Sequence, residues 1–416
     1  MENHRSDVTI LASDSVVCTV LRDSRCFISS GDSNSVHNYA DASNVVVDAR
    51  IRTSKCYIYN SGNSVTIQSG TGKDTISNNG SNVEIYGSGG ADSIRNRVRV
   101  RIDANNNPTA TLSSGNKVFI SGGDGNDTIE NFGGKATLSG AKGDDVIYNY
   151  GIMLVDKNGN EVGHLPTDKG YSINGGAGND SIYNYNSNAT IRSGDGDDLI
   201  HNFGSKVSIN ASLGADTVYN HGSNVTIYGG AGADVFTNYF VVQADDNGNI
   251  ISTLSAATDV LINCDDDNDF VENFGAKATI NGGNGDDTIY NYGIFVADKN
   301  YKIIETSPTN KGYSINGGAG NDIIYNENSN AVIYGNKGND TILNRYGTNV
   351  TIDGGDGDDQ IVSAAGNNTF TGGAGNDFFL HEAGNVVITD FSTTDTLQIG
   401  NGKKRALTQQ SRAGKI

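Results

Sequence analysis

The chain has 416 residues, of which 55 are glycine, 3 are proline and none is tryptophan, and its formal net charge is −19. Such a chain is poor in the large side chains of a compact core, and it lacks the clustered Lys and Arg that a nucleic-acid backbone requires. It also has no apolar run of about 18 residues, and residues 1–15 lack a signal-like apolar region, so we predict no membrane span. The excess of carboxylates favours cations as partners.

Residues 1–60 carry a degraded form of the apolar spacing that fills the later chain, as in 28–38 (ISSGDSNSVHN) and 55–60 (KCYIYN). At the position where each later repeat has its aspartate, residues 1–60 have Asn34 and Cys56 instead. We therefore expect degenerate N-terminal cap coils here, without metal ligands. The four cysteines, Cys18, Cys26, Cys56 and Cys264, lack a zinc-site spacing and are predicted to be packed thiols, with a Cys18–Cys26 disulfide as the alternative.

From residue 61 to 385, one aspartate recurs at steps of 18 or 35 residues, with a single step of 19. A step of 35 is a step of 18 with an insertion of 17. So regular a spacing indicates a repeat array, and its function should be sought in the repeat. The aspartates are Asp74, Asp92, Asp127, Asp145, Asp180, Asp198, Asp216, Asp234, Asp269, Asp287, Asp322, Asp340, Asp359 and Asp377.

Each 18-residue unit consists of two nonapeptides, as in residues 175–192, GGAGNDSIY and NYNSNATIR. An apolar residue stands two positions after every aspartate, and a second apolar column follows nine residues later. Two short strands per unit predict an all-β fold, a parallel β-roll or β-helix solenoid of 18-residue coils. The apolar residues do not follow a helical period, and this much glycine would destabilise a helix.

The first nonapeptide of each unit contains the candidate metal-binding residues. Glycine stands two residues before the aspartate in all loops but one, where Asp267 replaces it, and it often stands four before. Glycine permits positive φ, so the chain can wind tightly and bring carbonyl oxygens and the carboxylate together. Many hard oxygen ligands suit Ca²⁺ better than Mg²⁺, which prefers a strict octahedron. The fourteen aspartates are therefore the candidate calcium ligands, with up to thirteen stacked sites in one row.

The loops GGDGNDTIE (122–130), GGAGNDSIY (175–183) and GGNGDDTIY (282–290) resemble the RTX nonapeptide GGxGxDxUx of haemolysin-type calcium-binding proteins. The resemblance covers about residues 69–400. It implies a parallel β-roll that is disordered at low cytosolic calcium and folds outside the cell. Family arrays usually repeat the glycine-rich loop every nine residues, whereas here the alternate nonapeptide has no aspartate ligand. We infer a single calcium row on one edge.

The other edge has an asparagine four residues after the aspartate in twelve repeats, which predicts a ladder of amides. Four 17-residue insertions follow Asn96, Asn149, Asn238 and Asn291, and segments such as 152–165 (IMLVDKNGNEVGHL) predict β-hairpins on this non-calcium edge. The tyrosines three residues after the aspartate are predicted to stack on one another between coils. The alternative is that they form an exposed aromatic strip that binds sugar rings.

A row of threonines in the second strand of the units has ice binding as an alternative function.

At the C-terminal end, residues 386–400 (VVITDFSTTDTLQIG) resemble the closing segment of RTX arrays, and we expect a capping segment there. Residues 401–416 are basic and polar and are expected to be a disordered tail.

No enzyme motif is present, so we predict no enzymatic activity. The sequence predicts a calcium-binding module of a bacterial protein that is secreted or exposed at the cell surface, with type I secretion as the candidate route. It would serve a structural or adhesive role, with a cell-surface glycan or host surface as the candidate partner. The alternative is an accessory calcium-binding module of a secreted hydrolase, epimerase or pore-forming toxin whose active part lies elsewhere.

Overall fold

The computed structural model describes residues 2–3, 8–10, 17–20, 25–28, 34–38, 45–50, 53–112, 116–245, 249–364 and 366–400. All regular elements in these ranges are β-strands, as the sequence predicts, and none is a helix that could cross a membrane. The chain divides into two compact units, Met1–Thr217 and Val218–Ile416, which we describe separately. The predicted tail at 401–416 and the side chains of Cys18 and Cys26 lie outside the described residues.

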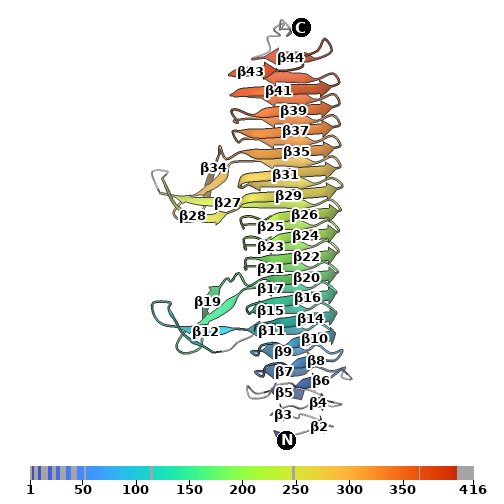
Figure 1. The fold of residues 1–416 in the computed structure, drawn as a ribbon, viewed down its shortest axis with the longest axis vertical. Coiled ribbons are helices and arrows are strands. Elements are labelled where there is room, and N and C mark those ends of the chain that lie inside the picture. The colour runs from blue at the N-terminus through green and yellow to red at the C-terminus, as the bar shows by residue number, and fades with distance from the viewer. Residues whose placement is uncertain are drawn as a thin grey trace, which may run out of the picture. The chain divides into compact units, whose positions relative to one another are not determined.

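The first unit contains two parallel sheets, in which each strand pairs with the equivalent strand of the next coil (Figure 1). The A sheet holds the strands that follow the aspartate position: β1 (Glu2–Asn3), β3 (Val17–Val20), β5 (Asn34–Asn38), β7 (Cys56–Asn60), β9 (Thr75–Asn78), β11 (Ser93–Arg97), β15 (Thr128–Phe132), β17 (Val146–Asn149), β21 (Ser181–Asn184) and β23 (Leu199–Asn202). The B sheet holds the strands that lead into the glycine-rich loop: β2 (Val8–Ile10), β4 (Arg25–Ile28), β6 (Val46–Asp48), β8 (Thr66–Gln68), β10 (Glu84–Gly89), β14 (Val118–Asp124), β16 (Ala136–Lys142), β20 (Tyr171–Ala177), β22 (Ala189–Asp195) and β24 (Ser208–Leu213).

The second unit repeats this plan after β25 (Thr217–Asn220), which begins at the end of the first. Its A-sheet strands are β27 (Val235–Ala244), β30 (Phe270–Phe274), β32 (Thr288–Asn291), β36 (Ile323–Asn326), β38 (Thr341–Asn344), β40 (Gln360–Ser363), β42 (Phe378–His381) and β44 (Thr396–Ile399). Its B-sheet strands are β26 (Thr226–Ala231), β29 (Thr258–Asp266), β31 (Ala276–Asn284), β35 (Tyr313–Ala319), β37 (Ala331–Lys337), β39 (Thr351–Asp356), β41 (Asn367–Ala374) and β43 (Asn385–Ile388).

The core of each unit consists of the two apolar columns. In the A sheet of the first unit, Ile129 pairs with Ile147 and Ile147 with Ile182, and all three side chains are fully buried. In its B sheet, Leu138 pairs with Ile173 and Ile173 with Ile191. Equal residues on successive coils keep the register, because a slip by one residue would turn every apolar side chain outward. The sequence-predicted solenoid of 18-residue coils is confirmed.

The four insertions form hairpins on the edge that follows the asparagine, as expected. In the first unit β12 (Arg99–Ile102) pairs with β13 (Pro108–Thr111), and β18 (Ile152–Val155) pairs with β19 (Glu161–Leu165). β12 and β18 also pair in parallel, so the two hairpins make one four-stranded sheet, β13-β12-β18-β19, which we call the first flap (Figure 1).

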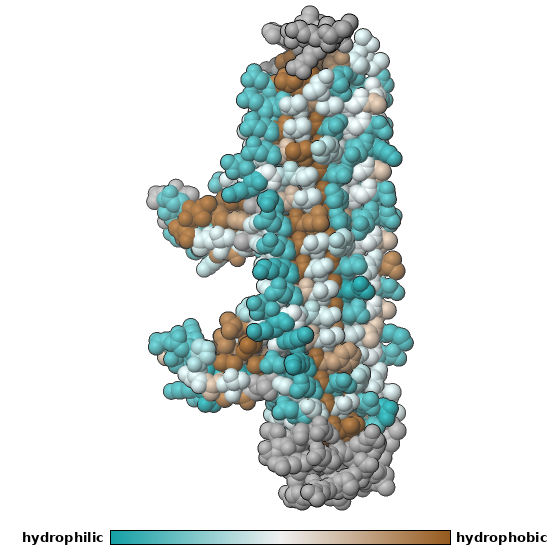
Figure 2. All heavy atoms as spheres, viewed as in Figure 1, coloured by the Kyte–Doolittle hydropathy of each residue, from teal (hydrophilic) through white to brown (hydrophobic). Residues whose placement is uncertain are grey.

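The second unit carries a corresponding second flap. The C-terminal part of β27 pairs with β28 (Ile250–Ala256), β33 (Ile294–Ala297) pairs with β34 (Ile303–Ser307), and β27 pairs in parallel with β33. Figure 2 shows hydrophobic residues on both flaps. The large side chains that the second flap exposes include Ile250, Ile251, Tyr301 and Ile304.

Candidate metal centre along the glycine-aspartate edge

The fourteen recurring aspartates lie in the loops between the B and A sheets, and each exposes 3% or less of its surface. Within each unit, Oδ1 of one aspartate accepts a hydrogen bond from the backbone N–H of the aspartate in the preceding coil. The Asp127 N–H donates to Asp145 Oδ1 at 2.7 Å, and the Asp269 N–H donates to Asp287 Oδ1 at 2.8 Å. The aspartates therefore form a buried column along one edge of each unit.

The second carboxylate oxygen of most of these aspartates lacks a hydrogen-bond donor. Oδ2 is buried and has no partner in Asp92, Asp127, Asp145, Asp180, Asp269, Asp287, Asp322, Asp340 and Asp359. Burial raises their pKa, to about 8 for Asp92 and Asp269, about 7 for Asp145, Asp180, Asp322 and Asp359, and about 6 for Asp127, Asp287 and Asp340. A buried ionised carboxylate needs a counter-charge, so each is poised to hold a cation or a proton.

The three glycines of one loop serve different purposes. A Cβ on Gly282 would lie 2.2 Å from Asp287 Oδ2 and 2.3 Å from the carbonyl oxygen of Gly317 in the next coil, so in this loop a side chain at Gly282 would displace one of these two oxygens. Gly283 and Gly285 have φ of +121° and +131°, a region that side chains rarely adopt. The loop thus brings a carboxylate oxygen and a carbonyl oxygen of successive coils together with no donor between them.

A second, exposed column lies one residue before the aspartates. The Asn179 N–H donates to Asp144 Oδ1 at 2.9 Å, and the Asp197 N–H donates to Asn179 Oδ1 at 3.0 Å. In the second unit the Asn321 N–H donates to Asp286 Oδ1 at 2.6 Å. These bonds hold successive loops in register on the solvent-exposed side. The Oδ1 atoms of these Asp and Asn side chains already accept hydrogen bonds from backbone N–H groups.

The donor set fits a calcium ion. No group of three His, Cys, Asp or Glu side chains meets in the described residues, so a bound metal would have to take backbone carbonyls beside the aspartate of each loop. Calcium accepts such sets of six to eight oxygens, whereas transition metals favour imidazole and thiolate. The unpartnered Oδ2 atoms and the neighbouring loop carbonyls are hard oxygens of this kind.

The loop before Asp269 departs from the pattern, as its sequence CDDDND indicates. Cys264 is fully buried at the position of the close-packed glycine, and burial raises the pKa of its thiol. Asp265 and Asp267 take the glycine positions with φ of +76° and +78°, so this loop is strained. Asp269 nevertheless keeps its place in the column, since its Oδ1 accepts the Asp234 N–H at 2.8 Å.

The first and last residues of the aspartate column differ in kind: the column starts beside a cysteine in the first unit and finishes at a further aspartate in the second. At its start, the Cys56 N–H donates to Asp74 Oδ1 at 2.7 Å, so Cys56 occupies the aspartate position, as predicted. In the second unit the Asp377 N–H donates to Asp395 Oδ1 at 3.1 Å, and the Ser392 N–H donates to Asp395 Oδ2 at 2.6 Å. The repeat pattern does not predict Asp395, because its loop lacks the glycines, although it lies 18 residues after Asp377.

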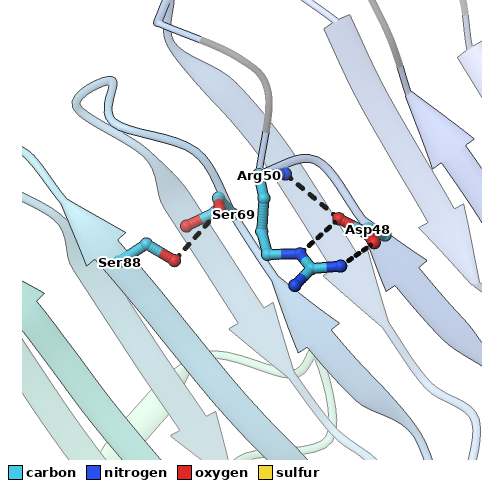
Figure 3. Close-up of polar contacts among 4 residues, drawn as sticks. All are labelled: Asp48, Arg50, Ser69 and Ser88. Atoms are coloured by element: carbon cyan, nitrogen blue, oxygen red, sulfur yellow. Dashed lines mark hydrogen bonds and ion pairs between the residues drawn. The ribbon is translucent and has the colours of Figure 1, made fainter.

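The first coils of this edge use other groups, which Figure 3 shows. Arg50 donates through Nε and Nη2 to Asp48 at 2.9 and 2.7 Å. Ser69 and Ser88 replace loop glycines, and Ser88 Oγ donates to the Ser69 carbonyl at 3.1 Å. The expected metal-free cap at residues 1–60 stays a prediction, and the Arg50–Asp48 pair supports it.

The opposite edge is held by the predicted asparagine ladder. Asn184 illustrates it: Nδ2 donates to Asn202 Oδ1 and to the Asn186 carbonyl, both at 2.8 Å, while Oδ1 accepts from Asn149 Nδ2 at 2.8 Å and from the Asn186 N–H at 3.2 Å. The amide is fully buried and all four of its hydrogen-bonding positions are used. Hydrogen bonds between amides thus join successive coils on this edge. The ladder comprises Asn38, Asn60, Asn78, Asn96, Asn131, Asn149, Asn184 and Asn202 in the first unit, and Asn220, Asn238, Asn273, Asn291, Asn326 and Asn344 in the second.

The tyrosines beside this ladder stack on one another. Tyr148 and Tyr183 have ring centroids 4.8 Å apart, and Tyr183 and His201 5.2 Å apart, with interplanar angles of 16° and 8°. A neighbouring column stacks Tyr185 on Phe203 at 4.7 Å. The structure confirms stacking between coils in the first unit, where the stacked rings cover the faces that a sugar ring would need. In the second unit Tyr290 and Tyr325 are tilted by 55° to each other.

A comparison with known protein families finds a calcium-binding repeat motif in most of the glycine-aspartate loops. A family model described as the RTX calcium-binding nonapeptide repeat, four copies, matches residues 118–131, 172–200, 210–238, 279–291, 314–330 and 349–388. The matched segments contain nine of the fourteen aspartates and leave out Asp74, Asp92, Asp145, Asp269 and Asp340. No curated protein matches the chain.

Proposed function

The chain carries RTX calcium-binding nonapeptide repeats, and we propose that it binds calcium in one row along the aspartate column of each unit, in a β-roll that folds on calcium. The buried aspartate Oδ2 atoms without donors carry this proposal. The fourteen aspartates are the proposed ligands, and stacking between them gives up to about thirteen sites. Calcium, when bound, supplies the charge that neutralises the column.

We propose a structural and adhesive role in a secreted or surface-exposed bacterial protein. Where calcium is scarce, the unneutralised column opposes folding; where calcium is plentiful, binding and folding become one step. This coupling suits export in an unfolded state, and type I secretion is the proposed route. The proposed organisation is an N-terminal cap at 1–60, calcium-binding coils at 61–385 and a closing segment at 386–400. The proposal assigns no catalytic step to this chain.

The Asp287→Asn variant tests the ligand assignment, because its expected effect on stability is opposite with and without calcium. Asp287 lies in a fully matched loop, and its Oδ2 has no donor. The amide removes a buried charge, so we expect the variant to be more stable than the parent without calcium, less stable with calcium, and to bind fewer calcium ions. Urea unfolding in both conditions, with calcium stoichiometry from isothermal titration calorimetry, measures this reversal.

Asp286→Asn is the matched control, since it makes the same charge change at the adjacent residue. Asp286 is exposed and its Oδ1 accepts the Asn321 N–H, a role that an amide oxygen can keep. We expect unchanged stoichiometry for this variant. Equal calcium binding by the parent and Asp287→Asn would overturn the ligand assignment.

A further inference from the structure

The first flap contains an open pocket of about 580 Å³. Its lining includes the apolar Ile102 of β12 and Val162 of β19, together with Arg101 and Lys157. A volume of this size, with apolar walls and a few charged groups, is typical of sites for small molecules. The pocket lies on the inserted hairpins, away from the aspartate column, which runs along the other edge of the roll.

Arg101 lines this pocket and is partly exposed. Its Nε is buried without a hydrogen bond, and no hydrogen bond or ion pair of its guanidinium is found among the described residues. The other arginines of the same run are bonded: Arg95 to Glu130, Arg97 Nη1 to Ser77 Oγ at 3.1 Å, and Arg99 Nη2 to the Gly159 carbonyl at 3.1 Å. A guanidinium is always charged and can only donate, so the donors that Arg101 presents to the pocket call for an anionic acceptor.

Two aspartates also line the pocket, but the turns of their own hairpins use their carboxylates. Asp103 Oδ1 accepts the N–H groups of Asn105 and Asn107 at 2.8 and 2.9 Å. Asp156 Oδ1 accepts the N–H groups of Asn158 and Asn160, both at 2.8 Å. These bonds hold the pKa of both carboxyls below its ordinary value. Neither aspartate is an ion-pair partner of Arg101 among the described contacts.

The second flap shows that the hairpin framework does not need the arginine. The chain duplicates itself at an offset of 142 residues, which places Gln243 at the position of Arg101. Gln243 is satisfied within its own flap, because Nε2 donates to the Asp298 carbonyl at 3.3 Å and Oε1 accepts from Ser252 Oγ at 3.0 Å. The unpartnered cation is therefore a property of the first flap's pocket and not of the fold.

We propose that the first flap binds a sugar-sized ring bearing a carboxylate, with the carboxylate on Arg101 and the less polar face of the ring against Ile102 and Val162. Charged donors such as guanidinium form their strongest hydrogen bonds with carboxylates. The ligand is either a free sugar acid or one unit of an acidic polysaccharide. This site gives the proposed adhesive role a ligand class and rests on that role, not on calcium binding.

Isothermal titration calorimetry of the full chain in calcium tests this site, with sodium glucuronate as the probe, oligogalacturonate as its polymeric form and glucose as the neutral control. We expect glucuronate to bind and glucose not to bind. Tighter binding of oligogalacturonate would also support the site and identify a polysaccharide as its source. Glucuronate and oligogalacturonate that both bind no better than glucose would overturn the proposal.

Arg101→Gln, which copies Gln243 of the second flap, should weaken glucuronate binding by about tenfold or more. Arg192→Gln is the control, because Arg192 is exposed on β22 and does not line the pocket. Equal glucuronate affinities of the two variants would refute the role of Arg101. Calcium stoichiometry, measured on the same samples, should not change in either variant, so a failure here is distinguishable from a failure of calcium binding.

Discussion

Without calcium, the chain is expected to fold near pH 5 and to unfold as the pH rises towards 8. Burial raises the pKa of nine aspartates of the column to about 6 to 8 in the folded state, against about 3.8 for the ordinary group. The folded state therefore binds protons that the unfolded state releases between these values. The resulting stability is full below about pH 3.8 and is lost as the pH rises through 6 to 8. Far-UV circular dichroism of calcium-stripped protein against pH measures it.

Other carboxyls limit this effect at the acid end. The carboxyls of Asp103, Asp156 and Asp298 accept backbone N–H groups in hairpin turns, which lowers their pKa, so they lose stabilising bonds as the pH falls through their folded-state values. We therefore expect the calcium-free optimum near pH 5. The control is the calcium-saturated chain, whose spectrum should be constant from pH 6 to 8. A calcium-free chain that becomes more structured as the pH rises from 5 to 8 would contradict the assignment of the column.

Asn184→Ala is expected to destabilise the first unit by roughly 3–5 kcal/mol, with or without calcium. The change leaves the Asn149 amide, the Asn202 Oδ1 and both backbone groups of Asn186 without their partners in a fully buried ladder. An unmade hydrogen bond inside a protein costs the desolvation of each group. Urea unfolding followed by circular dichroism measures the change.

Asn105→Ala is the control for the ladder, because Asn105 is an exposed residue of a hairpin turn. We expect a change of about 0.5 kcal/mol or less for this control. The loss in Asn184→Ala should not depend on calcium, whereas the effect of Asp287→Asn should change sign with it. A ladder variant as stable as the parent would mean that the aliphatic columns alone hold that edge.

The repeat made the fold and the aspartate column predictable from the sequence. A column such as Ile129, Ile147 and Ile182 recurs at steps of 18 and 35 residues, the coil length without and with an insertion, so this spacing places its members on neighbouring coils. The asparagine ladder was predictable for the same reason, because Asn149 and Asn184 occupy equal positions. Side chains at one register position of a solenoid necessarily meet.

Features outside the period could not be predicted. The parallel pairing of β12 with β18 joins insertions about 54 residues apart, and nothing in either hairpin specifies the other as its partner. Asp395 was missed because its loop lacks the glycines, although its spacing continues the column. The exposed ladder of Asp144 and Asn179 depends on loop geometry, which spacing does not reveal. The unpartnered Nε of Arg101 follows from the packing of the flap.

The most direct test of calcium-coupled folding is far-UV circular dichroism of the purified chain near neutral pH, titrated with CaCl₂, reversed with EGTA and repeated with MgCl₂. The buried aspartate column predicts a cooperative, reversible transition from coil to β-structure that calcium produces and magnesium does not. A folded spectrum that is indifferent to calcium would contradict it, and would mean that the asparagine and aliphatic columns suffice to hold the roll.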